Sequence, residues 1–119
     1  MSDLSAERIA KNDATFRAAN EKVAAAAEDY ELSGRVPFIC ECAEPSCTDV
    51  FLVDLDDYRD VRSHPRRFLN VPGHQGLMVS AGAGVVLEDR GTYLVVEKTG
   101  RAGEIAEATA DVDDPQEVA

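Results

Sequence analysis

The sequence predicts an α+β protein in which a long N-terminal helix precedes a small zinc-stabilised domain of two β-hairpins and a short helix. A helical pattern of apolar residues occupies positions 5–31. Residues 38–53 and 85–98 are rich in strand formers, and turn residues divide each stretch. All three cysteines fall within residues 40–47, in the spacing C-x-C-x4-C. Together these observations favour a small mixed fold built around a metal site.

Length and composition suggest how the chain is divided. Its 119 residues are enough for one modest hydrophobic core. We expect residues 1–33 to form the N-terminal helix, residues 34–100 a small α+β metal-binding domain, and residues 101–119 an acidic, largely disordered tail. From Glu104 onward the chain contains six acidic residues and no basic one, which is typical of a solvated segment.

The N-terminal helix is expected to span residues 5–31, with Ser5 as its N-cap and Glu7 in its first turn. Large apolar residues recur every seven positions, and smaller residues follow three positions after the first three of them. The large residues are Ile9, Phe16, Val23 and Tyr30, and the smaller ones are Asn12, Ala19 and Ala26. Such a narrow stripe is typical of a helix that packs closely against another helix. Packing onto its own domain and pairing with a second copy or a partner helix both remain open.

The central stretch predicts a hairpin followed by a short helix. Residues 32–37 are expected to form a hinge, since they contain a helix-ending Ser-Gly pair and a proline. Residues 38–42 and 48–53 are then expected to form two strands joined by a turn. Asp54 is expected to cap a short helix over residues 55–63, which a His-Pro pair ends.

The C-terminal half predicts the clearer hairpin. Residues 66–75 are expected to form a loop that returns toward the cysteines, and residues 78–84 a flexible turn. Residues 85–98 contain two apolar arms around an Asp-Arg-Gly turn, in which glycine can take a positive φ. Residues 104–110 are expected to form a weak helix, and the chain is expected to be disordered from Asp111 onward.

The cysteine spacing indicates a metal site. In a strand, residues two apart point to one face, so Cys40 and Cys42 would lie side by side, with Glu41 on the opposite face. The following Ala-Glu-Pro-Ser turn would fold Cys47 back over the first two sulfurs. Three converging thiolates make a soft, compact, negatively charged pocket, which suits zinc better than calcium or magnesium.

A structural zinc site needs a fourth ligand, and the chain has two histidines. His74 follows a Val-Pro-Gly sequence that would shape a tight loop, so we predict the ligand set Cys40, Cys42, Cys47 and His74. His64, a carboxylate or a water molecule are the alternatives for the fourth position.

Two other interpretations of the cysteines remain open. One is that they are redox-active or reactive thiols, and the other is that they are small buried residues without chemistry. A disulfide between Cys40 and Cys42 would be strained, although Cys47 could pair with either of them. An odd number of cysteines argues against a secreted disulfide scaffold.

Two resemblances accompany these motifs. The spacing of Cys40, Cys42 and Cys47 is similar to that of the zinc-binding cysteines in the tail after the catalytic domain of SET-type lysine methyltransferases. That resemblance covers eight residues and implies coordination geometry, with no implication for methyl transfer. The sequence F-I-C-E-C with Pro45 and Cys47, followed by R-R-F, P-G-H and Y-L-V-V-E-K, resembles a group of small bacterial proteins of unknown function. This second resemblance covers roughly residues 5–100 and implies a common small fold with a Cys/His site.

The charge balance argues against some classes of binding partner. The formal net charge is −11, so nucleic-acid phosphates and anionic membranes would repel most of the surface. One basic segment exists, with Arg59, Arg62, Arg66 and Arg67 within nine positions. It is either a docking site for an acidic or phosphate-bearing partner or a solvated helix end. No apolar stretch is long enough for a membrane helix and no signal-peptide pattern is present, so we expect a cytoplasmic location, where thiols stay reduced.

Three functions are consistent with these features. The first is a small cytosolic zinc-binding protein with a structural Cys3His site, acting as a protein-interaction or regulatory module through another protein or a second copy of the chain. The second is a thiol-based redox sensor whose cysteines release metal on oxidation. The third is a small zinc enzyme in which Glu41 or Glu44 acts as a base. The motifs of zinc deaminases, C-x-x-C oxidoreductases and serine hydrolases are absent from the sequence, which favours a non-enzymatic protein.

Overall fold

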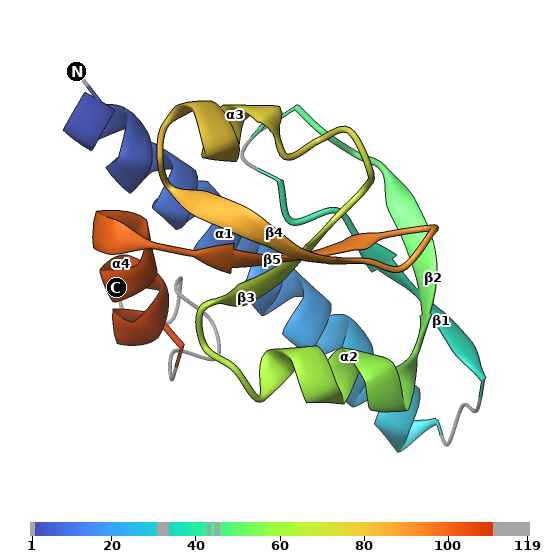
Figure 1. The fold of residues 1–119 in the computed structure, drawn as a ribbon. Helices are drawn as coiled ribbons and strands as arrows, with labels where there is room; N and C mark the ends of the chain where they lie inside the picture. The colour runs from blue at the N-terminus through green and yellow to red at the C-terminus, as the bar shows by residue number, and fades with distance from the viewer. Residues whose placement is uncertain (1, 31–33, 43, 45, 111–119) are drawn as a thin grey trace.

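The described part of the chain, residues 2–30, 34–42, 44 and 46–110, folds into one long helix, two small antiparallel sheets and three shorter helices (Figure 1). This computed structural model confirms the predicted α+β class, with a long N-terminal helix, two hairpins and a short helix after the first hairpin. In chain order the elements are α1 (Ser2–Asp29), β1 (Arg35–Ile39), β2 (Val50–Asp54), α2 (Leu55–Arg62), β3 (Arg67–Asn70), α3 (Gly76–Ser80), β4 (Gly84–Asp89), β5 (Leu94–Lys98) and α4 (Gly100–Ala108). The expected tail from residue 111 lies outside the described residues.

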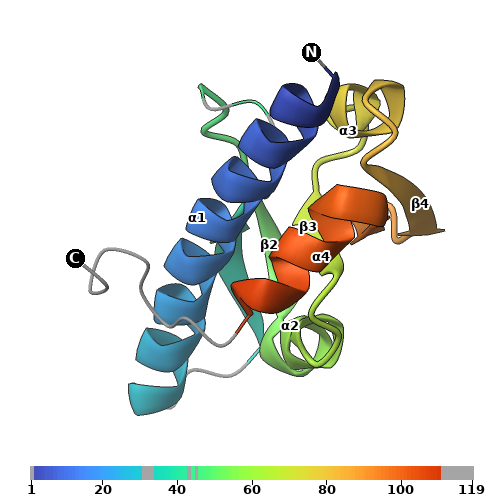
Figure 2. The same cartoon turned by 90° about the vertical axis from the view of Figure 1, so that its left-hand side faces the viewer.

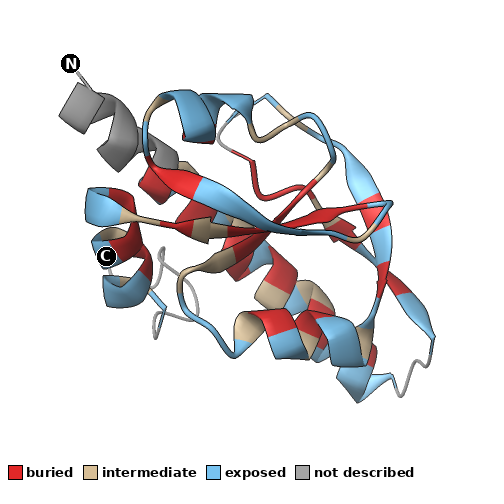
Figure 3. Cartoon of the chain, viewed as in Figure 1, coloured by how far each residue is buried: buried red, intermediate tan, exposed pale blue. Residues whose placement is uncertain are grey.

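Helix α1 begins at Ser2, so Ser5 lies within the helix and the prediction of an N-cap there is wrong. The face of α1 that packs into the protein also differs from the predicted apolar stripe. The buried residues of this inner face are small or polar: Ala10, Asp13, Ala14, Arg17, Ala18, Asn20, Ala24 and Ala27. In the stripe, Phe16 and Val23 are half-buried, while Ala19, Ala26 and Tyr30 are exposed. Figure 3 shows both buried and exposed residues along α1. Alanines at the contact allow α1 to approach its neighbours closely.

Strands β1 and β2 form the first hairpin, in which Phe38 pairs with Phe51. The prediction of a hinge reaching Pro37 is wrong, because Pro37 lies within β1 opposite Leu52. Proline is tolerated there because each strand of a two-stranded sheet has an unpaired edge that needs no donor. The strand ends at Ile39, earlier than expected, although the Cys40 amide still donates to the Asp49 carbonyl at 2.9 Å.

Helix α2 follows directly from the hairpin, as predicted, with Asp54 at its N-cap position. Tyr58 and Val61 are buried, and the Tyr58 ring stacks on Phe38 with the two ring centroids 4.2 Å apart. The hydroxyl of Tyr58 donates to Glu21 of α1 at 2.8 Å. Helix α2 is therefore fixed both to the hairpin and to α1.

The second sheet has the strand order β3-β5-β4. The predicted hairpin over residues 85–98 is confirmed as β4 and β5, and Gly91 takes the expected positive φ of 86°. The predicted loop over residues 66–75 is wrong in part, since β3 pairs with β5 within it. The expected turn over residues 78–84 is wrong in part, because α3 extends to Ser80 and β4 begins at Gly84, which leaves residues 81–83 as the turn. A side chain at Gly84 would meet the Glu97 carbonyl and the Met78 sulfur at 2.6 Å, so this close packing requires glycine.

Helix α4 begins at Gly100, four residues before the predicted weak helix, and ends at Ala108. It runs beside α1 (Figure 2). Arg17 of α1 fastens the two helices, because its guanidinium donates to the Ala106 carbonyl at 3.1 Å and to the Thr109 hydroxyl at 2.8 Å. No helix in the described ranges has both the length and the apolar character needed to cross a membrane.

The core consists of two apolar clusters on opposite sides of the second sheet. One contains Phe38, Tyr58 and Val95 together with the rest of the first hairpin, and the other contains Phe68, Leu94 and Val96 together with α4. A buried ion pair lies in the second region, where Asp13 Oδ2 of α1 is 2.5 Å from Lys98 Nζ of β5. The Lys98 ammonium also lies 5.4 Å from the centroid of the Phe68 ring.

Candidate metal centre

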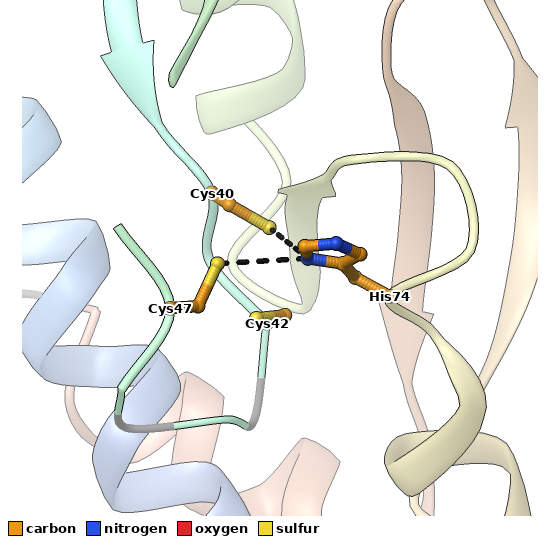
Figure 4. Close-up of side chains that lie close together, drawn as sticks. All are labelled: Cys40, Cys42, Cys47 and His74. Atoms are coloured by element: carbon orange, nitrogen blue, oxygen red, sulfur yellow. Dashed lines mark hydrogen bonds between the residues drawn. The ribbon is translucent and has the colours of Figure 1, made fainter. Parts of the chain in front are cut away.

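Four side chains converge beside the connection between β1 and β2: Cys40, Cys42, Cys47 and His74 (Figure 4). One ligand atom from each, the three Sγ atoms and a ring nitrogen, lies within 4.8 Å of all the others. These are the four residues that the sequence analysis proposed as ligands. The chain therefore presents a Cys3His cluster that is suited to holding a metal ion.

Two turns bring the cluster together. Cys47 returns over the other sulfurs because its amide closes a turn onto the Glu44 carbonyl at 3.0 Å. His74 is held in the turn after β3, where its amide donates to the Val71 carbonyl at 3.0 Å. The first hairpin thus supplies three sulfurs, and the connection between β3 and α3 supplies the imidazole.

Glu41 fixes the two cysteines on either side of it. Its fully buried carboxylate accepts hydrogen bonds from Arg62 at 2.8 and 2.9 Å, from the Asn20 amide at 2.7 Å and from the Leu69 backbone at 2.9 Å. The Glu41 amide also donates to the Leu69 carbonyl at 2.7 Å. Because these contacts tie Glu41 to α1, α2 and β3, its carboxylate cannot serve as the base that an enzyme would need at the cluster.

The imidazole of His74 is oriented from both sides. Its Nδ1 lies 3.6 Å from the Cys40 sulfur and 3.5 Å from the Cys47 sulfur. Its Nε2 lies 3.3 Å from Asp49 Oδ2. A carboxylate on the far ring nitrogen is the usual outer partner of a metal-binding histidine, because it fixes the tautomer and the orientation of the ring.

The sulfur environment differs around the cluster. Cys40 and Cys42 are buried, and burial raises the pKa of both thiols. The Val71 amide lies 3.2 Å from the Cys40 sulfur and donates to it. Two buried thiols that favour the protonated form would have to lose their protons to solvent before their sulfurs could bind a cation. Metal binding here is therefore coupled to proton release.

An open hollow of about 470 Å³ adjoins the cluster. Cys42, Cys47 and His74 lie in its wall, together with Glu44 and Asp49. Cys47 and His74 are the two half-buried members of the cluster. The cluster is therefore closed toward the core and open to solvent along one side.

His64, the alternative fourth ligand, is exposed in the turn after α2 and is not part of the cluster in the described chain. Its amide donates to the Val61 carbonyl at 3.1 Å, which completes the end of α2. His74 thus has the position that the predicted ligand set requires.

The arginine segment, which the sequence left open as a docking site or a solvated helix end, makes internal ion pairs. Each of its four members lies within 4.0 Å of a carboxylate from another element: Arg59 of Glu21 and Glu28 on α1, Arg62 of Glu41, Arg66 of Glu107 on α4, and Arg67 of Glu97 on β5. Because the four side chains point to different elements, they form no common surface for a phosphate. The segment instead connects α2 and β3 to the rest of the fold.

The residues that support the cluster were not predicted from the sequence. Asn20 donates to the Ile39 carbonyl and accepts from the Ile39 amide, both at 2.9 Å, so it holds the end of β1 against α1. Asp49 and Arg62 were not identified either. A polar signal was present for Asn20, which stands among alanines on α1, but its partners come from distant segments of the chain.

Comparisons of the chain with models of protein families, with curated proteins and with solved structures found no match. The functional assignment consequently depends on the geometry of the cluster and on the chemistry of its four side chains.

Proposed function

We propose that this chain is a small zinc-binding protein. Cys40, Cys42, Cys47 and His74 hold one zinc ion in a structural site, and the domain that the ion stabilises acts as a protein-interaction or regulatory module. The observation that carries the proposal is the convergence of three sulfurs and one ring nitrogen within 4.8 Å.

The distances within the cluster support a tetrahedral ion. With zinc–sulfur bonds of about 2.3 Å and zinc–nitrogen bonds of about 2.0 Å, tetrahedral geometry separates sulfur from nitrogen by about 3.5 Å. The separations of His74 Nδ1 from the Cys40 and Cys47 sulfurs are 3.6 and 3.5 Å. Thiolate-rich ligands also favour zinc over the hard cations calcium and magnesium.

The proposed role of zinc follows from where the ligands come from. Cys40, Cys42 and Cys47 belong to the first hairpin, whereas His74 follows β3 of the second sheet. An ion bound by all four would connect the two sheets. It would do so through the connections after β1 and β3, where no strand pairing joins the two sheets within the described segments. Four protein ligands would leave no open position for a substrate, which favours a structural site over a catalytic one.

Metal content tests the proposal directly. Protein purified without added metal is expected to contain about one zinc per chain. Cys42→Ser should lose nearly all of the zinc and unfold in part, because a buried ligand is lost, and His74→Ala should retain zinc more weakly. His64→Ala is the matched control, since His64 is exposed outside the cluster, and it should keep the full zinc content. Full zinc content in His74→Ala would contradict the assigned ligand set.

We assign the interaction role to the exposed stripe on α1. Ala19, Ala26 and Tyr30 of this stripe face solvent, so a second copy of the chain or a helix of another protein can pack there. Nucleic acids and anionic membranes are not expected partners, because the net charge is −11 and the arginine segment is paired internally. A reducing compartment such as the cytoplasm would keep the thiols available for the metal.

A thiol-based redox sensor is the second candidate. The half-buried positions of Cys47 and His74 beside the hollow favour it, because an oxidant can reach the centre from this side. If the protein is a sensor, moderate oxidant should release zinc reversibly and change partner binding. A purely structural site should keep its zinc under the same treatment.

A further inference from the structure

The three sulfurs of the metal centre differ in their access to solvent. Cys40 is 2% exposed and does not line the hollow, and Cys42 lines it but is only 1% exposed. Cys47 also lies in its wall and is half-buried, so it is the most exposed of the three. Figure 4 shows Cys47 on a segment of its own, across from the strand end that carries the other two cysteines. A small molecule that enters the hollow therefore meets the sulfur of Cys47 first.

The sulfurs also differ in their hydrogen bonds. The Val71 amide donates to Cys40, and such a bond withdraws electron density from a thiolate. Among the described residues, no backbone amide donates to the Cys47 sulfur, whose polar neighbour is the proposed ligand atom Nδ1 of His74. When metal is bound, the Cys47 thiolate thus has less outside stabilisation than the Cys40 thiolate.

A bound zinc ion keeps this thiolate reactive. Three thiolates outnumber the charges of a divalent ion, so the centre as a whole is anionic and its sulfurs stay electron-rich. The nucleophile in cysteine chemistry is the thiolate, and metal coordination is one of the ways in which it is maintained at neutral pH. Access and charge together make Cys47 the nucleophile of the centre.

The hollow also selects by charge. Glu44 and Asp49 lie in its wall, and both are exposed carboxylates beside an anionic centre. Ser46 and Thr48 add hydroxyl groups without adding positive charge. An anionic reagent is repelled from such a site, whereas a small uncharged one is not.

We propose that Cys47 is a modification site, at which the zinc-bound thiolate reacts with small uncharged electrophiles that enter the hollow. The inference rests on the zinc centre proposed above. A bond forms between the sulfur and the electrophilic carbon, and the leaving group departs with the electron pair of its own bond to that carbon. No proton is transferred, because the sulfur is already deprotonated. The product is a neutral thioether, a poor zinc ligand, so the modification loosens the metal and with it the junction of the two sheets.

Iodoacetamide is the probe. The zinc-loaded full chain is treated with it, the labelled cysteine is located by peptide mass spectrometry, and zinc release is followed with a chelating dye. Cys47 should be labelled about tenfold faster than Cys40 or Cys42, at a rate proportional to the iodoacetamide concentration, and zinc release should follow labelling. The ratio of the iodoacetamide rate to the iodoacetate rate is measured for the protein and for glutathione. It should be about ten times larger for the protein, because the carboxylates around the hollow repel iodoacetate.

Glu44→Gln supplies the matched variant, because it removes one charge and keeps a side-chain acceptor for Ser46. It should speed the reaction with iodoacetate selectively and leave the zinc content unchanged. Asp57→Asn on α2 removes one exposed charge outside the wall of the hollow and should change neither rate.

The outcomes separate the two proposals. A zinc-loaded protein in which Cys40 or Cys42 is labelled first, or in which the labelling rate ignores the iodoacetamide concentration, overturns the assignment of Cys47 and leaves the zinc site intact. Protein that binds no zinc overturns both.

Discussion

At the scale of single residues, the Cys3His cluster is supported by a carboxylate that is not one of its four candidate ligands. Glu41 separates Cys40 from Cys42, and its side chain is fully buried against Arg62 and Asn20. A buried carboxylate is costly unless it is paired and hydrogen-bonded, and here it receives both kinds of partner. The hydrogen bonds of Glu41 require a particular backbone conformation, and the same conformation orients the side chains of Cys40 and Cys42.

Glu41→Gln tests this support. Removing the charge leaves Arg62 buried without its partner, so the free energy of unfolding should fall by about 3 kcal/mol, measured by urea denaturation with zinc held at a fixed free concentration. Zinc affinity, measured by chelator competition, should fall as well although all four ligands remain. Glu44→Gln is the control, since Glu44 is exposed and its change should leave stability within about 0.5 kcal/mol. Unchanged zinc affinity in Glu41→Gln would show that Glu41 does not support the proposed zinc ligands.

The four cluster residues could be predicted from the sequence because their signals are local. Cys40, Cys42 and Cys47 lie within one short stretch, and His74 lies in a turn with its own proline and glycine. The supporting contacts could not be predicted, because Asn20 and Arg62 reach Glu41 from helices whose packing no local pattern specifies. The contact of Asp49 with His74 could not be predicted either, since a carboxylate next to a strand is usually a solvated residue.

At the scale of elements, α1 has two different sides. The side that packs into the protein carries alanines and paired polar residues such as Asp13 and Arg17, so a count of large apolar residues identifies the wrong face. The heptad stripe on the neighbouring side is left partly uncovered. Strand β3 was missed for a related reason: its Arg-Phe-Leu-Asn sequence does not alternate, and its extended state comes from pairing with β5 on one edge and with Glu41 on the other. The β4–β5 hairpin was predicted because its turn and its arms are adjacent in sequence.

Self-association through the stripe has a sharp test. Ala26→Glu places a charge on the exposed stripe, and analytical ultracentrifugation should show a dimer for the parent chain and a monomer for this variant, because a buried unpaired charge would oppose helix pairing. Ala25→Glu is the matched control, as Ala25 is an exposed alanine outside the stripe, and it should remain dimeric. A monomeric parent chain at high micromolar concentration would remove pairing with a second copy and leave a helix of another protein as the occupant.

At the scale of the whole molecule, a buried ion pair joins α1 to the second sheet and gives stability a dependence on pH. Burial raises the pKa of Asp13 from 3.8 to about 6, against the opposing attraction of Lys98. The folded state therefore binds this proton more tightly than the unfolded state does. Asp13 favours folding most at low pH, and this contribution declines as pH rises from about 4 to about 6.

Asp13→Asn isolates the effect. The difference in unfolding free energy between the parent chain and this variant should change by about 2 kcal/mol between pH 4 and pH 6, with the parent chain losing stability relative to the variant as pH rises. Urea denaturation at several pH values measures it, and contributions common to both proteins, zinc loss included, cancel in the difference. Parallel pH profiles would show that the carboxyl titrates at an ordinary pKa.

The uneven spacing of the four cluster residues along the chain has a kinetic consequence for the proposed zinc site. Cys40 and Cys47 are seven positions apart, whereas His74 follows 27 positions after Cys47. Closing the longer loop costs about 1 kcal/mol more in chain entropy than closing the shorter one. During synthesis the three cysteines would leave the ribosome first and bind the ion. His74 would emerge later and complete the site. Metal capture would then precede assembly of the second sheet, so the supply of zinc would control how quickly a nascent chain matures.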